Sequence, residues 1–201
     1  MSPILVAGIG NIFKGDDGFG VAVAQRMTGR SLPAGVTVKD FGIRSLDLTY
    51  ALLDGYAATV LVDTAQRGEP PGTVYIIEPE ASAIADPQPE DLLLSPHELD
   101  PATVLRLALA LGSDCRRVIL VACEPASFGD EELGAMELTP PVAAAVDPAA
   151  DLVEQVIRKL LAEENPPWTA AIHPSRSPAA PLSLTETVRE TREWADGAYS
   201  A

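Results

Sequence analysis

Near its start the sequence reads ILVAGIGNIFKGDDGFG (residues 4–20), a hydrophobic run that leads through a glycine-rich loop into a helical pattern. This order is typical of dinucleotide-binding proteins, but two features of the loop disfavour that function. Phe13 stands where the third glycine of the dinucleotide motif is required. Asp16 and Asp17 would repel a phosphate at the start of the helix. A phosphate-binding P-loop is also absent, so the loop indicates an α/β fold with a different ligand.

The rest of the first 165 residues repeats the alternation of strand and helix patterns. Short runs rich in β-branched residues predict strands at 4–7, 36–39, 59–62, 74–77 and 118–122. Helical spacing of hydrophobic residues predicts helices over 18–28, 45–53 and 101–111. Asp147 and Pro148 have the N-cap and first-turn pattern of a final core helix, and Thr139-Pro140 predicts a short helix before it. The sequence therefore predicts an α/β domain.

Composition narrows the choice of partners. The 201 residues include 14 Lys and Arg against 29 Asp and Glu, a net charge of −15. This excess disfavours nucleic acid and a polybasic membrane anchor, because both need clustered cations. No apolar run approaches the roughly 20 residues of a membrane span, and the N-terminus lacks a secretory signal, so we expect a cytoplasmic protein without membrane contact. Cys115 and Cys123 are expected to be buried free thiols.

The chain divides into two parts by composition. Residues 1–165 hold nearly all of the excess negative charge and form the predicted domain. Residues 166–201 begin with a linker rich in Pro, Ala and Ser and include one short helical pattern at 183–196. An isolated helix of this length is marginal in water, so a disordered appendage is favoured over a docked helix or a partner-recruiting helix.

Three side chains are candidates for a metal site. One carboxylate is enough to cap the helix after the glycine-rich loop, and Asp16 is favoured for that role, which leaves Asp17 to face the ligand-binding edge of the sheet. Asp63 ends a predicted strand at the same edge, although alone it would read as a turn or cap residue. His97 lies in a loop and is the only histidine of residues 1–165. Two carboxylates and an imidazole suit zinc, nickel or ferrous iron.

Other catalytic groups compete poorly with this set. The sequence has no Gly-x-Ser-x-Gly nucleophile motif. Cys123 ends a predicted strand at the same edge, but burial beside Glu124 is expected to raise the pKa of its thiol and make it unreactive.

Four ordered motifs resemble those of the hydrogenase maturation proteases. They are the loop from Gly8 to Gly20, the strand ending Val62-Asp63-Thr64, the Ser95-x-His97-Glu98 loop, and Glu124-Pro125 followed by Leu138-Thr139-Pro140. The resemblance covers residues 3–164 and implies a three-layer α/β/α sandwich, phosphorylase/hydrolase-like, with a twisted, mostly parallel five-stranded sheet.

By motif match, the resemblance implies that Asp17, Asp63 and His97 contact the metal. Many relatives have Glu at the first of these positions, and relatives often have a Gly-Gly or Gly-Thr turn where this chain has Asp40-Phe41-Gly42.

The implied function is an aspartic-type endopeptidase that activates hydrogenase. It removes the C-terminal extension of a nickel-loaded large-subunit precursor of nickel–iron hydrogenase. The nickel is supplied by the substrate, with zinc or cadmium as substitutes in vitro, and Asp16 or Asp63 is the expected base. We expect a monomer or weak oligomer. The alternative is a non-catalytic α/β module, either a nucleotide binder or a metal-dependent chaperone for the same partner.

Two acidic windows flank the predicted cleft. Residues 78–100 contain seven Asp and Glu, residues 124–154 contain eight, and neither window contains Lys or Arg. These windows predict an acidic rim that attracts a cationic or metal-bearing substrate tail.

Overall fold

The computed structural model describes residues 3–78, 101–113, 117–130 and 134–164. These residues cover most of the predicted domain at 1–165. The predicted linker and tail at 166–201, including the helix expected at 183–196, lie outside the described residues, as do His97 and Cys115.

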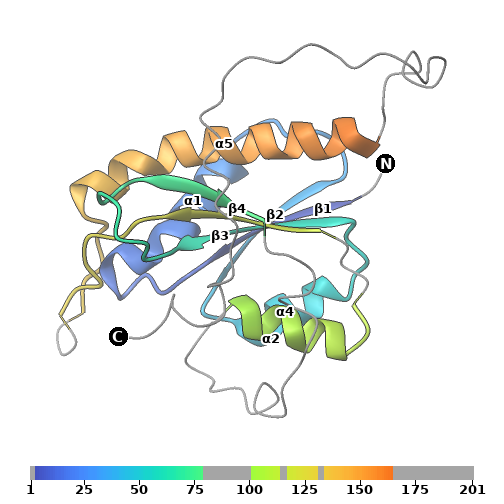
Figure 1. The fold of residues 1–201 in the computed structure, drawn as a ribbon, viewed down its shortest axis with the longest axis horizontal. Helices are drawn as coiled ribbons and strands as arrows, with labels where there is room; N and C mark the ends of the chain where they lie inside the picture. The colour runs from blue at the N-terminus through green and yellow to red at the C-terminus, as the bar shows by residue number, and fades with distance from the viewer. Residues whose placement is uncertain (1–2, 79–100, 114–116, 131–133, 165–201) are drawn as a thin grey trace.

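A five-stranded sheet forms the centre of the fold (Figure 1), with strands in the order β2-β1-β3-β5-β4. The strands are β1 (Ile4–Ile9), β2 (Val36–Gly42), β3 (Ala58–Thr64), β4 (Val74–Ile77) and β5 (Val118–Cys123). All neighbours run parallel except β4, which pairs antiparallel with β5. Every residue of β1, β3 and β5 is buried, as expected for strands covered on both faces. The predicted mostly parallel sheet is confirmed.

Helices cover both faces of this sheet. They are α1 (Phe19–Thr28), α2 (Ser45–Leu52), α4 (Pro101–Ala110) and α5 (Pro140–Glu164), and a 3₁₀ turn, η1 (Gly15–Gly18), precedes α1. In Figure 1, α1 and α5 lie on one face and α2 and α4 on the other. Each face has its own buried core, one including Phe19 and Ile157 and the other Leu48 and Leu105. The three-layer α/β/α sandwich is thus confirmed. None of the described helices is both long and apolar enough to cross a membrane.

The last helix differs from the prediction. Instead of a short helix from Thr139-Pro140 and a second one from Asp147, α5 runs without a break from Pro140 to Glu164, with Pro148 inside it. Pro148 has no N–H to donate to the carbonyl of Ala144 four residues earlier. Both residues are exposed, so water reaches that carbonyl and the helix tolerates the proline.

A close approach between α1 and the sheet fixes the loop that joins them. A Cβ on Gly20 would lie 2.0 Å from the carbonyl oxygen of Val62 and 2.3 Å from that of Ile9. Only glycine lets the first turn of α1 lie directly on β1 and β3. The loop between β1 and α1 is therefore held at the carboxyl ends of these two strands.

Candidate active site

The candidate site lies where the chain reverses its direction of travel across the sheet. β1 has β2 on one side and β3 on the other, and the helices that follow β1 and β2 cover opposite faces. Ligands of open α/β sheets bind at such a switch point, beyond the carboxyl ends of the strands. Asp17 lies in η1 after β1, and Asp63 is the last residue but one of β3.

The structure brings Asp17 and Asp63 close to Gly10. The backbone of Gly10 has φ +122°, and a Cβ there would lie 1.8 Å from the carbonyl oxygen of Asp17 and 3.7 Å from Oδ1 of Asp63. The Asp17 carboxylate accepts hydrogen bonds from the backbone N–H of Asn11, at 2.7 Å, and from the side chain of Thr64. Thr64 follows Asp63 directly, and its N–H donates to Asp63 Oδ1 at 2.8 Å. These contacts through Gly10 and Thr64 support the prediction that the two carboxylates lie at the same edge of the sheet.

Electrostatics at Asp17 favour a cation. Burial raises the pKa of Asp17, and the Asn11 N–H, the charge of Lys14 and the Thr64 side chain act in the opposite direction. Asp63 is only 3% exposed. Two neighbouring carboxylates with little access to water are costly to ionise together, and a bound cation offsets that cost.

His97, the third predicted ligand, lies outside the described residues. Among the residues that the structure describes, no three His, Cys, Asp or Glu side chains gather as a metal site. The ligand set of Asp17, Asp63 and His97 therefore stays a prediction.

Asp16 connects three loops. It is 0% exposed, and its carboxylate accepts hydrogen bonds from the N–H groups of Ala126 (2.8 Å), Ser127 (2.9 Å) and Thr139 (2.7 Å) and from the Thr139 hydroxyl (2.9 Å). The expectation that Asp16 caps α1 is wrong, because the N-cap is Gly18 and no side chain bonds there. Asp16 as a base stays a prediction, and its burial among four donors favours a positioning role instead.

A third carboxylate at this edge received no role from the sequence. Asp40 lies on β2 opposite Gly8, and its Oδ2 accepts a hydrogen bond from Gln25 Nε2 at 3.3 Å. The turn after it is close to the site, since the Gly10 N–H donates to the carbonyl of Gly42 at 3.1 Å. The sequence signal that could have identified Asp40 is its position at the end of a predicted strand, which the structure places next to β1.

Glu124 shapes the loop after β3. Its buried carboxylate accepts hydrogen bonds from the N–H groups of Arg67 and Gly68 and from the Tyr75 hydroxyl. Burial and the nearby Glu124 carboxylate raise the pKa of Tyr75, so this hydroxyl keeps its proton. The sequence marked Glu124 only as part of a motif, because its partners lie about 50 residues away.

The prediction for Cys123 is confirmed. Its side chain is buried at the end of β5, and burial, together with the charges of Asp16 and Glu124, raises the pKa of the thiol to about 12. A thiol of this kind stays protonated near neutral pH and is a poor nucleophile.

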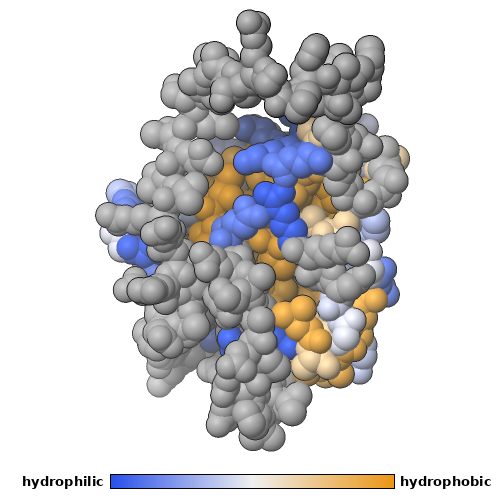
Figure 2. All heavy atoms as spheres, turned by 45° about the vertical axis from the view of Figure 1, so that its right-hand side comes forward, coloured by the Kyte–Doolittle hydropathy of each residue, from blue (hydrophilic) through white to orange (hydrophobic). Residues whose placement is uncertain are grey.

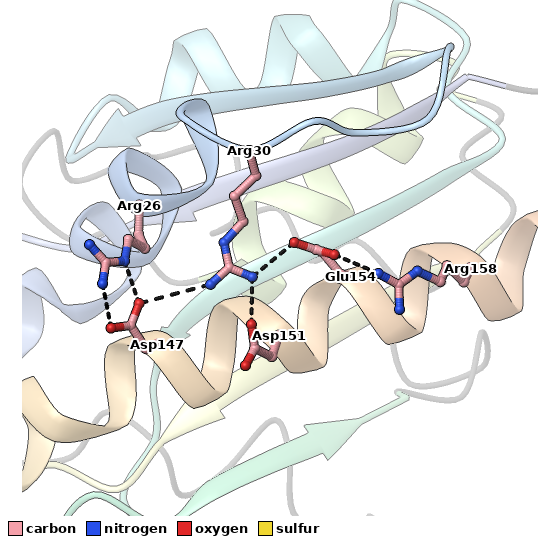
Figure 3. Close-up of polar contacts among 6 residues, drawn as sticks. All are labelled: Arg26, Arg30, Asp147, Asp151, Glu154 and Arg158. Carbon is pink, nitrogen blue, oxygen red and sulfur yellow. Dashed lines mark hydrogen bonds and ion pairs between the residues drawn. The ribbon is translucent and has the colours of Figure 1, made fainter.

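The predicted acidic rim is wrong for three residues of α5. Figure 3 shows Asp147, Asp151 and Glu154 facing arginines across the contact between α1 and α5. Arg26 pairs with Asp147, and Arg30 lies within ion-pair distance of all three acids. Asp147 is about two helical turns from the start of α5, so these charges lie along the helices and not at the strand ends.

Further ion pairs lie at the amino end of β5, away from the candidate site at the carboxyl ends of the strands. Arg117, directly before β5, pairs with Glu78 and with Glu163 in the last turn of α5. On the side shown in Figure 2, hydrophilic residues lie directly beside hydrophobic ones. Of the described residues in the two acidic windows, Glu78 thus pairs with an arginine away from the carboxyl ends of the strands, as the three acids of α5 do.

Comparison with known proteins agrees with this architecture. Residues 21–156 match the family model described as hydrogenase maturation protease. The chain is 31% identical over 156 residues to the hydrogenase expression/formation protein HupD of Bradyrhizobium diazoefficiens, covering 77% of each chain. It is 29% identical to the hydrogenase 2 maturation protease of Escherichia coli, covering 85% of this chain and 98% of the relative.

Solved structures show the same fold. The hydrogenase maturating endopeptidase HybD of Escherichia coli superposes with a TM-score of 0.61 at 25% identity, covering 78% of this chain and 93% of that one. The hydrogenase 2 maturation peptidase of a Thaumarchaeota archaeon superposes with a TM-score of 0.56 at 30% identity, covering 77% and 97%. The chain therefore belongs to the family of hydrogenase maturation proteases, which are endopeptidases.

Proposed function

We propose that this protein hydrolyses the peptide bond that joins a C-terminal extension to the large subunit of a nickel–iron hydrogenase. Membership of the family supports the reaction class and the kind of substrate. The observation that carries the proposal is the placement of Asp17 and Asp63 close to Gly10, at the switch point of the sheet.

Recognition in this proposal depends on the substrate's metal. Nickel held by the precursor's own thiolates reaches the strand ends, where Asp17 and Asp63, together with the predicted ligand His97, complete its coordination. Carboxylate and imidazole groups are ligands that divalent nickel accepts, and zinc or cadmium would fit the same set in vitro. The burial that raises the pKa of Asp17 supports this role, since a cation stabilises the ionised carboxylate.

Hydrolysis proceeds by direct attack of water. Asp63 accepts a proton from the water as its oxygen bonds to the scissile carbonyl carbon, and the C–N bond then breaks as the leaving nitrogen takes up a proton. This aspartic-type mechanism needs no covalent enzyme intermediate. The burial and high pKa of Cys123 agree with it, because they remove the thiol at this edge as a nucleophile.

Mass spectrometry of the large subunit tests the proposal. Incubation with the protein is expected to shorten a nickel-loaded precursor to one defined mass and to leave a nickel-free precursor intact. Cleavage of both forms to the same extent would refute recognition through the metal. Binding without shortening would identify the alternative, a metal-dependent chaperone, and a thermal shift with NAD or ATP but not with divalent cations would identify a nucleotide binder.

A further inference from the structure

Four large hydrophobic side chains are exposed beside the candidate site. Phe13 is 58% and Met136 is 72% exposed, and Ile12 and Phe128 are exposed as well. They come from three loops, at residues 11–14, 127–129 and 134–138. We call Ile12, Phe13, Phe128 and Met136 the apolar rim.

Backbone hydrogen bonds join these loops into one surface. Ala135 N–H donates to the carbonyl of Phe13 at 3.0 Å, and Gly15 N–H donates to the carbonyl of Ala135 at 2.7 Å. Asp16 N–H donates to the carbonyl of Ser127, directly before Phe128, at 3.1 Å. The Asp16 carboxylate joins the same part of the chain from inside, through the N–H groups of Ala126, Ser127 and Thr139.

The rim is also continuous with the candidate metal-binding carboxylates. Asn11 donates its N–H to Asp17 Oδ2 at 2.7 Å and accepts the N–H of Phe13 on its side-chain oxygen at 2.9 Å. One residue thus bonds both to the Asp17 carboxylate and to the backbone of Phe13. The loop that carries Phe13 therefore borders the position of Asp17.

We propose that the apolar rim binds a hydrophobic surface of the folded large-subunit precursor, next to the point where its extension enters the site. This inference rests on the proposed function. Large apolar side chains that are exposed together, on loops joined by hydrogen bonds beside a reaction site, mark a protein interaction surface. Within the three loops only Lys14 and Glu137 are charged, and their charges are opposite, so hydrophobic burial and not net charge supplies the contact. A second copy of this chain is the competing occupant.

The test compares matched pairs of exposed hydrophobic residues. The rim variant is Phe13→Ser with Met136→Ser, and the control is Leu46→Ser with Tyr50→Ser on α2, where the side chains are 52% and 62% exposed. Cleavage of nickel-loaded precursor is followed by mass spectrometry over a range of precursor concentrations. We expect the rim variant to raise KM about tenfold or more with kcat nearly unchanged, and the control to match the wild type.

An unchanged KM in the rim variant would overturn the inference. Loss of cleavage by Asp17→Asn in the same assay would show that the proposed function stands without the apolar rim. If the wild type fails to cleave, the proposed function fails. Binding of precursor to immobilised protein then tests the apolar rim separately. Equal capture of precursor by the wild type and by the rim variant would overturn the inference. Phe128→Ser is a second variant should the first fail to fold. Sedimentation that shows a wild-type dimer, lost in the rim variant with KM unchanged, would assign the surface to a second copy instead.

Discussion

Replacing Gly10 by alanine tests the geometry that brings the two aspartates together. The added Cβ would lie 1.8 Å from the carbonyl oxygen of Asp17, a separation that forces η1 to move. A side chain at φ +122° costs about 1–3 kcal/mol of strain, and the displaced backbone costs about 1–3 kcal/mol more. We expect Gly10→Ala to lower the free energy of unfolding by roughly 2–6 kcal/mol.

Two other glycines separate these contributions. Gly55 has φ +77° with nothing within 4 Å of an added Cβ, so Gly55→Ala carries strain without a clash and is expected to cost about 1–2 kcal/mol. Gly29 has φ −86° and open space around it, so an alanine there meets neither backbone strain nor a steric clash. Gly29→Ala is expected to be neutral or slightly stabilising.

Urea unfolding followed by circular dichroism gives the three free energies directly. If Gly10→Ala loses no more stability than Gly55→Ala, the close contact between Gly10 and Asp17 is wrong. Cleavage adds a functional reading, because a shift of about 1 Å in Asp17 is expected to reduce the rate by about a hundredfold. A folded Gly10→Ala protein that cleaves at the wild-type rate would contradict the placement of Asp17 in the site.

Three further predictions concern single side chains. Asp16→Ala leaves three backbone N–H groups without their acceptor, so urea unfolding should show a loss of about 3 kcal/mol or more, against about 0.5 kcal/mol or less for the exposed Asp54→Ala. The raised pKa of Asp17 stabilises the fold below the ordinary value of 3.8, and this contribution is lost as the pH rises through the raised pKa. Asp17→Asn should therefore raise the melting temperature at pH 7 and change it little below pH 3.8. An equal effect at both pH values would contradict the raised pKa. Iodoacetamide at pH 8 should leave Cys123 unmodified in peptide maps until urea unfolds the protein, and rapid labelling of the native protein would contradict its burial.

The strands were predictable because local sequence determines them. The hydrophobic runs of β1, β3 and β5 are buried throughout, so composition alone identified them. The antiparallel direction of β4 has no such local signal. The same holds for α5, where Asp147 and Pro148 have a local start pattern although the helix begins at Pro140. Packing of Val142, Ala145 and Ala149 in the core continues the helix across that signal.

The candidate site was predictable only in part for the same physical reason. Asp17 follows β1 and Asp63 lies at the end of β3, and the parallel pairing of these two strands brings their carboxyl ends together. The partners of Asp16 are more than 100 residues away, so its local position suggested a helix cap where the fold uses it to hold three loops. Long-range hydrogen bonds of this kind leave no local pattern.

Cleavage of nickel-loaded precursor by matched Asp-to-Asn variants tests the central claim most directly. Mass spectrometry should show the extension removed by the wild type and by Asp54→Asn, whose carboxylate is exposed on a different part of the chain. Asp17→Asn and Asp63→Asn should leave the precursor at full length, and His97→Gln should do the same if it is the third ligand. Full cleavage by Asp17→Asn or Asp63→Asn would contradict the assignment of these two carboxylates to the substrate's metal.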